Sequence, residues 1–339
     1  MSGIQTGRQA IYYLVEGKVS WPPVVVPFGL DPFGWHGERK SYREICDFAL
    51  KKCTLLPKVF PVANPLCIGK GVIQKSNKQV RKYELRGAKK LLSMEEVQNP
   101  GDSSWHVRKR WIENEDDFEI FLGLKNLPPS EPDIEAVRAK ENQIGQYGLP
   151  YAEITDPFGI VSEMFPTDTF YIKILNDTER IMKLLIQTSQ RVIDCIEALC
   201  RDTGAPFILR LIGAEMAVPP FLSRDKFLYF EGEFYRRVAA IAANYNVLTA
   251  FHCHGPLREI MADIWKMGYN FIEPFEPPPR GNVSIAQALA AANGRGIVFG
   301  GVDDVLLATG SLEDVRIAVK GCLDDSRHTG KPFILSQSA

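Results

Sequence analysis

Two histidines alternate with a cysteine in the motif FHCHG, residues 251–255. The motif continues the apolar run Val247–Ala250, which has the length and composition of a buried strand. Because strand side chains point alternately to opposite faces, His252 and His254 share one face and Cys253 points away. Two imidazoles on one face, just before a Gly-Pro turn, are suited to bind zinc. A packed histidine beside a solvated one is the alternative.

Carboxylates follow other predicted strands. Glu276 is predicted as the third ligand, which gives a His, His, Glu set with an open fourth position, as in catalytic zinc sites. Glu273 is the fallback ligand, or a hydrogen-bond partner of a ligating histidine. Glu215 and Asp303 are the predicted catalytic acids that orient or protonate the substrate. Solvation of Glu273 and Glu276, or their pairing with Arg280, is the alternative.

A glycine-rich loop near the N-terminus carries the aromatic residues Phe28, Phe33 and Trp35. These are predicted to bind substrate, because aromatic side chains over a barrel mouth form a pocket that accepts a ring. Asp156 and Phe158, after the third predicted strand, complete the predicted substrate-binding set. Ordinary packing of the loop explains the aromatic residues equally well, and an acid next to proline also fits a turn or helix cap.

Eight short apolar or β-branched runs are the elements that must position these residues. They are Val24–Phe28, Leu56–Val62, Pro150–Thr155, Phe207–Ile212, Val247–His252, Asn270–Phe275, Ile297–Gly301 and Pro332–Ser336. Helical periodicity lies between most of them and is clearest over Asp177–Arg201. This alternation predicts an α/β fold, a (β/α)8 TIM barrel with its chemistry at the carboxyl ends of the strands. A doubly wound sheet is the alternative.

The stretch from about residue 71 to 147 interrupts the alternation. Gly71–Val97 is polar and alternating, which predicts an antiparallel hairpin, and Asp116–Leu124 and Ile134–Asn142 read as helices. We therefore expect one domain over residues 1–339 with an inserted region after the second strand. The last predicted strand ends near Ser338 with no helix after it. The expectation is a further C-terminal segment, or a partner chain that covers that end of the barrel.

Composition narrows the class of protein. The chain has 339 residues, 45% of them hydrophobic, with 40 basic and 41 acidic side chains and a net charge of −1. Near-neutral charge gives no general attraction to nucleic acid or anionic membranes. No run approaches the roughly 20 apolar residues of a membrane span. The seven cysteines are dispersed without a CxxC pair, which predicts reduced thiols and a cytoplasmic protein.

Five segments resemble the uroporphyrinogen decarboxylase superfamily. In chain order they are GAEMAVPPFLSRDKF (213–227), FHCHG (251–255), GYNFIEPFEPPP (268–279), FGGVDD (299–304) and FILSQS (333–338). The resemblance is good from about Tyr151 onward and weak before it. It implies a (β/α)8 barrel, and it implies either porphyrinogen decarboxylation or the methyl transfer of the zinc- and corrinoid-linked branch.

Departures from each branch favour methyl transfer. The decarboxylases carry an arginine-rich R-Q-A-G-R segment after the first strand, whereas Val26–Trp35 contains no arginine to hold substrate carboxylates. The methyltransferases bind zinc through a His-x-Cys strand end, in some relatives an acid that Glu276 matches, and a distal cysteine. Here His254 replaces the first cysteine, and Ser336 and Ser338 stand near the distal one. Such a His, His, Glu set is harder than a thiolate set and suits polarisation of oxygen.

The resemblance thus implies a zinc-dependent methyltransferase acting on a small O-methyl donor, with the aromatic loop favouring a methoxylated aromatic one. No D-x-H-x-x-G segment is present, so the corrinoid (cobalamin) that accepts the methyl group would be carried by a partner protein. Zinc on His252, His254 and Glu276 would stabilise the leaving oxygen. Two alternatives stay open: a metal-free decarboxylase-like lyase, and a non-catalytic barrel that binds a tetrapyrrole or corrinoid. A homodimer is also open.

Overall fold

The computed structural model describes residues 6–18, 25, 30–64, 66–68, 72–76, 79–86, 90–100, 105–124, 127–276, 278–329, 331 and 333–338. The chain divides into two compact units. The first unit comprises Met1–Pro61, Asp133–Ile154 and Leu199–Ala339. The second unit comprises Val62–Pro132 and Thr155–Ala198.

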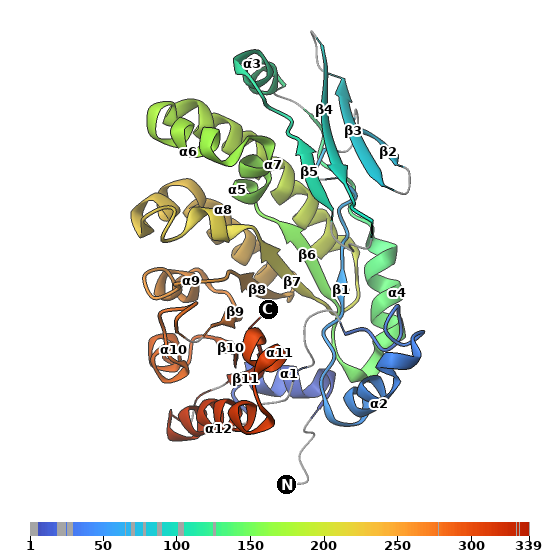
Figure 1. Cartoon of the computed structure of the whole chain (residues 1–339), viewed down its shortest axis with the longest axis vertical. Coiled ribbons are helices and arrows are strands. Elements are labelled where there is room, and N and C mark those ends of the chain that lie inside the picture. The colour runs from blue at the N-terminus through green and yellow to red at the C-terminus, as the bar shows by residue number, and fades with distance from the viewer. Residues whose placement is uncertain are drawn as a thin grey trace. The chain divides into compact units, whose positions relative to one another are not determined.

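A seven-stranded sheet forms the centre of the first unit (Figure 1), with strand order β1-β6-β7-β8-β9-β10-β11 and parallel pairing between neighbours. Its strands are β1 (Lys58–Val59), β6 (Tyr151–Thr155), β7 (Ile208–Ile212), β8 (Leu248–His252), β9 (Phe271–Phe275), β10 (Ile297–Val302) and β11 (Phe333–Gln337). Every residue of β9 and β10 is buried, as expected for parallel strands covered on both faces. The predicted α/β fold is confirmed, and these strands coincide with seven of the eight predicted runs.

Helices connect the successive parallel strands of the first unit, because a parallel pair needs a crossover rather than a tight turn. The helices of this unit are α1 (Arg8–Val15), α2 (Arg43–Lys52), α4 (Ile134–Ile144), α8 (Arg224–Asn244), α9 (Met261–Met267), α10 (Ile285–Ala292), α11 (Asp304–Thr309) and α12 (Leu312–Thr329). Local sequence sets where they begin. Ser284 and Gln287, for example, form a capping box at the start of α10.

Side chains on one face of this sheet form two layers along the strands. The layer nearer the amino ends is apolar and includes Tyr151, Ile208, Ala250 and Phe271. Two residues further along the same four strands, that face carries charged or ionisable groups instead. These are Glu153, Arg210, His252 and Glu273, and the parallel register places His252 directly beside Glu273.

The second unit contains an antiparallel sheet with strand order β2-β3-β4-β5. The strands are β2 (Val72–Ser76), β3 (Val80–Arg86), β4 (Leu91–Val97) and β5 (His106–Lys109). The unit also holds α3 (Glu115–Gly123), α5 (Pro157–Met164), α6 (Thr167–Asn176) and most of α7 (Thr178–Asp202). Among the helices that the structure describes, none combines the length and the apolar character that crossing a bilayer requires.

Several predicted segments can be compared directly with the structure. The predicted helices at Asp116–Leu124, Ile134–Asn142 and Asp177–Arg201 correspond to α3, α4 and α7 within a few residues. Where a hairpin was predicted over Gly71–Val97, the structure has three strands of the four-stranded sheet. The first predicted strand, Val24–Phe28, lies outside the described residues except for Val25.

Candidate metal centre

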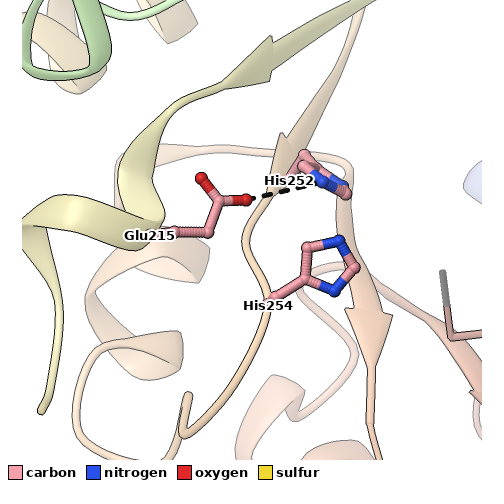
Figure 2. Close-up of side chains that lie close together, drawn as sticks. All are labelled: Glu215, His252 and His254. Carbon is pink, nitrogen blue, oxygen red and sulfur yellow. Dashed lines mark ion pairs between the residues drawn. The ribbon is translucent and has the colours of Figure 1, made fainter. Parts of the chain in front are cut away.

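Three side chains at or just after the carboxyl ends of β7 and β8 converge at the carboxyl edge of the parallel sheet. One ligand atom from each of Glu215, His252 and His254 lies within 4.8 Å of the others, and Figure 2 shows the carboxylate facing both imidazoles. Glu215 lies in a short 3-10 turn, Ala214–Ala217, which follows Gly213. Gly213 has φ of 114°, a conformation that glycine adopts readily, and it reverses the chain at the end of β7.

Two other residues of the charged set on this sheet face, Arg210 and Glu273, hold the ring of His252. Its Nδ1 lies 2.9 Å from Glu273 Oε2 and 2.6 Å from Arg210 Nη2, while its Nε2 lies 3.5 Å from Glu215 Oε1. Nδ1 can either donate to Glu273 or accept from Arg210, depending on the tautomer. In the tautomer that donates to Glu273, the lone pair of Nε2 is free on the side of Glu215. This is the arrangement in which a carboxylate fixes a metal-binding histidine.

A buried chain of charges extends from His252 across the sheet. Arg210 donates through Nε to Glu273 Oε1 at 2.6 Å and through Nη1 to Glu153. Lys58 Nζ lies 3.6 Å from Glu153 Oε2. Burial opposes the ionisation of Glu273, which is 0% exposed, but His252 and Arg210 lower the pKa of this carboxyl to about 2. Burial likewise opposes the charge of Arg210, whose pKa the two glutamates nevertheless raise.

His254 has its own carboxylate partner. Its Nδ1 lies 3.3 Å from Glu276 Oε1, and Glu276 Oε2 accepts from the backbone N–H of Gly255 at 2.6 Å. The hydrogen bond with Glu276 raises the pKa of His254, although burial opposes the shift. Burial would raise the pKa of Glu276, but its bonds with His254 and Gly255 lower it. Glu276 is therefore placed to orient His254, and Glu215 is the carboxylate that lies with the two imidazoles.

The carboxylate of Asp303 caps a helix and lies near an arginine. Its Oδ1 accepts from the N–H of Leu306 at 2.9 Å and caps α11, and its Oδ2 lies 3.8 Å from Arg280 Nε. The structure does not group it with Glu215 and the histidines among the described residues. Its predicted catalytic role stays a prediction.

The aromatic loop lies beside residues that precede β6. Phe33 packs against Tyr147 with ring centroids 5.9 Å apart, and its carbonyl accepts from Gln143 Nε2. Trp35 stacks with the guanidinium of Arg39 at 3.7 Å and is half-exposed. Tyr147 lies just before the amino end of β6, whereas the histidines lie at the carboxyl end of β8. The structure thus does not bring Phe33 or Trp35 to the histidines.

The other predicted substrate-binding residues have structural contacts of their own. Asp156 caps α5 by accepting from the N–H of Gly159 at 2.6 Å, and it is buried. Phe158 is buried against Phe170 with ring centroids 5.2 Å apart. Phe28 lies outside the described residues. Substrate binding by these residues stays a prediction.

The sequence reasoning missed Lys58, Glu153 and Arg210, three members of the charged chain. A signal for Arg210 was present, because it interrupts the apolar run FILRLI at residues 207–212. A charged side chain in a fully buried strand needs a buried partner. That partner was not identifiable, because it comes from a strand about sixty residues away in the sequence.

Comparison with known proteins identifies the family. Residues 133–339 match the family model for uroporphyrinogen decarboxylase (URO-D). The chain therefore belongs to the URO-D family, as the five resembling segments predicted. No curated protein sequence matches the chain.

A solved structure of a methyltransferase from Methanosarcina mazei is similar with a TM-score of 0.63 and 13% identity, covering 98% of this chain and 93% of the other. This similarity shows a shared fold. Two other solved structures are similar only with TM-scores below 0.5. They are a putative sporulation-specific glycosylase, ydhD, from Bacillus subtilis (0.31, 12% identity, 68% and 70% covered) and the IOLI protein with a zinc atom (0.32, 11% identity, 67% and 77% covered).

Proposed function

We propose that this protein is a zinc-dependent methyltransferase that transfers the methyl group of a small O-methyl donor to a corrinoid on a separate carrier protein. The observation that carries the proposal is the convergence of Glu215, His252 and His254 at the carboxyl edge of the sheet. Membership of the URO-D family and the fold shared with the Methanosarcina mazei methyltransferase support it. The cytoplasm is the proposed site of action.

The donor set fits zinc. Two imidazoles and one carboxylate with an open fourth position make up a common catalytic zinc set. Each histidine meets a separate carboxylate at Nδ1, Glu273 for His252 and Glu276 for His254, which directs both Nε2 atoms away from those partners. In addition, the imidazole of His252 is the only ion-pair partner within 4 Å of Glu215 among the described residues, and no lysine or arginine there approaches this carboxylate as closely. A cation between these three side chains would compensate that carboxylate.

The residues then take distinct roles. We propose Glu215 as the third ligand, with Glu276 orienting His254; the alternative, Glu276 as ligand and Glu215 as catalytic acid, follows from sequence alone. Bound zinc would supply a Lewis acid that stabilises negative charge on the leaving oxygen of the donor. Asp303 is the proposed proton donor to that oxygen. Its carboxylate would first have to leave Arg280.

The sheet is proposed to close into the (β/α)8 barrel of a single domain with residues of about 71–147 inserted. Val25 supports closure, because its N–H donates to Leu335 of β11 at 3.5 Å and it forms a parallel bridge with Thr54, just before β1. Val25 thus contacts chain at both edges of the seven-stranded sheet. A closed barrel gathers the strand ends around one mouth, where a small substrate can bind.

Family membership favours a second candidate, a URO-D-like decarboxylase. A porphyrinogen substrate with several carboxylates needs unpaired cations. Arg280, the arginine beside Glu276, is already paired with Glu276 and Asp304. Methyl transfer is therefore the function that the site supports best.

Metal content and methyl transfer test the proposal together. Purified protein should hold about one zinc per chain, as a three-ligand catalytic site predicts. His254→Ala should lose the zinc and lower demethylation at least about 100-fold, because a metal ligand is removed. Exposed His328 on α12 provides the matched control, and His328→Ala should keep both.

The assay supplies aromatic and aliphatic methyl ethers in parallel, with a reduced corrinoid carrier as acceptor. A faster reaction of the aromatic donor would support a pocket that accepts a ring. Full methyl transfer by zinc-free protein would contradict the zinc proposal. Decarboxylation of uroporphyrinogen without any methyl transfer would establish the second candidate instead.

A further inference from the structure

Two buried cysteines from distant parts of the sequence meet in the second unit. Cys67 and Cys195 are each 1% exposed. The Cys67 Sγ lies 3.9 Å from the carbonyl oxygen of Arg191, in contact with α7. Cys195 is four residues further along this helix, one turn away on the same face. Cys67 and Cys195 therefore meet at the same turn of α7, and their thiols are neighbours.

The side chain of Arg191 gives this thiol pair a positive neighbour. Arg191 is buried, its Nη2 donates to Thr188 Oγ1 at 3.0 Å, and its Nε has no hydrogen-bond partner. Among the described residues no carboxylate pairs with it. The group that favours its charge is Cys67, so the Cys67 thiolate is the anion that this guanidinium can stabilise.

The backbone at Cys67 is also unusual. Cys67 has φ of 52°, in the left-handed region that residues with a side chain rarely adopt. The turn is held by Asn64, whose Oδ1 accepts from the N–H groups of Leu66 and Ile68 and whose Nδ2 donates to the Ile68 carbonyl at 2.6 Å. Two further bonds connect the turn to Ser130, whose N–H donates to the Cys67 carbonyl oxygen and whose Oγ accepts from Asn64 Nδ2, each at 3.1 Å. None of these bonds lies within α7, so opening the turn would expose the Cys67 thiol without unfolding that helix.

We propose that Cys67 and Cys195 form an oxidisable dithiol, which closes to an intramolecular disulfide on reaction with a low-molecular-weight disulfide. The pair includes none of the residues proposed to bind metal, and its oxidation does not depend on the proposed methyl transfer. Arg191 stabilises the attacking thiolate. The neighbouring Cys195 thiol lowers the pKa of Cys67 more than burial raises it, in agreement with this assignment.

The exchange is balanced with oxidised glutathione as the reagent. The Cys67 thiolate attacks one glutathione sulfur, the S–S bond of glutathione breaks, and one glutathione thiolate leaves. Cys195 then loses its proton and attacks the Cys67 sulfur, which releases the second glutathione thiolate. Two protein thiols are oxidised, and one glutathione disulfide is reduced to two thiols.

Thiol titration and peptide mass mapping of the full chain test this proposal. After equilibration with oxidised glutathione and denaturation, the protein should have lost two of its seven thiols, and the peptides of Cys67 and Cys195 should be linked. Cys67→Ser should form no disulfide under the same conditions, and Cys195→Ser should stop at a mixed disulfide between Cys67 and glutathione, without an intramolecular link. Buried Cys200, also on α7, provides the control, and Cys200→Ser should still form the link.

The rate of disulfide formation tests the role of Arg191. Arg191→Met should slow disulfide formation about 10-fold through a smaller thiolate fraction, and Arg191→Lys should restore most of the rate. Seven free thiols after equilibration of the wild-type protein would overturn the proposal. A link between any other pair of cysteines would overturn it as well, and so would an unchanged rate in Arg191→Met.

Discussion

Arg210 in the first unit and Arg191 in the second are both buried, but their surroundings differ in charge. Arg210 donates to Glu153 and Glu273 and lies beside His252. Arg191 donates to a threonine hydroxyl and has no carboxylate partner among the described residues. The first arginine belongs to a network in which charges compensate each other, whereas the second leaves a positive charge available.

This difference indicates what each region is built to do. A compensated network is rigid, because moving any member leaves a buried charge unpaired. Rigidity is useful under His252, whose ring orientation determines where Nε2 points. An uncompensated guanidinium instead favours any group nearby that becomes negative. Beside Arg191, that group is the Cys67 thiol.

The largest effect is expected from removing Arg210. Arg210→Met should lower the free energy of unfolding by about 3–5 kcal/mol, because Glu153 and Glu273 would be left buried without their cation. Urea denaturation followed by circular dichroism measures the change. Arg236 on α8 pairs with Glu233 in solvent, and Arg236→Met should cost less than about 1 kcal/mol. Equal losses in the two variants would contradict the assignment of a compensated buried network.

A smaller effect on stability, with a clear effect on metal binding, is expected from Glu273→Gln. The amide keeps the shape of the carboxylate but not its charge, so we expect a loss of about 1–3 kcal/mol for a weakened charged hydrogen bond. Zinc affinity should fall about 10- to 100-fold, because His252 loses the partner that orients it. A competition titration with a zinc chelator measures the affinity. Unchanged affinity would show that Glu273 supports the fold but not the metal.

The smallest effect on stability is expected from Arg191→Met under reducing conditions. Methionine replaces a buried cation that has no carboxylate partner, and Cys67 can take up a proton, so no buried charge is left behind. The free energy of unfolding should change by less than about 1 kcal/mol, in either direction. Urea denaturation with excess reductant checks this. A loss as large as that in Arg210→Met would mean that Arg191 has a carboxylate partner in solution.

Much of the fold was predictable because its signals are local. The parallel strands read as short apolar runs, and α7 shows apolar residues such as Ile181, Leu185 and Val192 at helical spacing. The polar, alternating stretch after β1 predicted antiparallel pairing. It did not predict the number of strands, because β5 follows β4 after a stretch without periodicity. Helix N-caps such as Asp156 could also be predicted, since Asp before Pro is a local signal for the start of a helix.

The candidate site was only partly predictable. The pair His252 and His254 follows from alternation along one strand. The choice between Glu215 and Glu276 does not, because both follow strand ends and only the conformation of the intervening turns decides which reaches the imidazoles. Cys67 and Cys195 are distant in sequence, and no spacing rule connects them. Contacts between distant segments depend on the register of the sheet and the packing of helices, which composition and periodicity do not specify.

Arg210 lies between Glu153 and Glu273, and this position has a consequence for the history of the sequence. Loss of the arginine leaves Glu153 and Glu273 buried without their shared cation, whereas neutralising one glutamate leaves Arg210 paired with the other. A lineage that loses the arginine must therefore lose its acidic partners nearly at the same time. Homologous chains that lack the arginine should accordingly lack both carboxylates. Chains that keep both acidic residues without the arginine should be rare, so the two acidic positions should be inherited in dependence on the basic one.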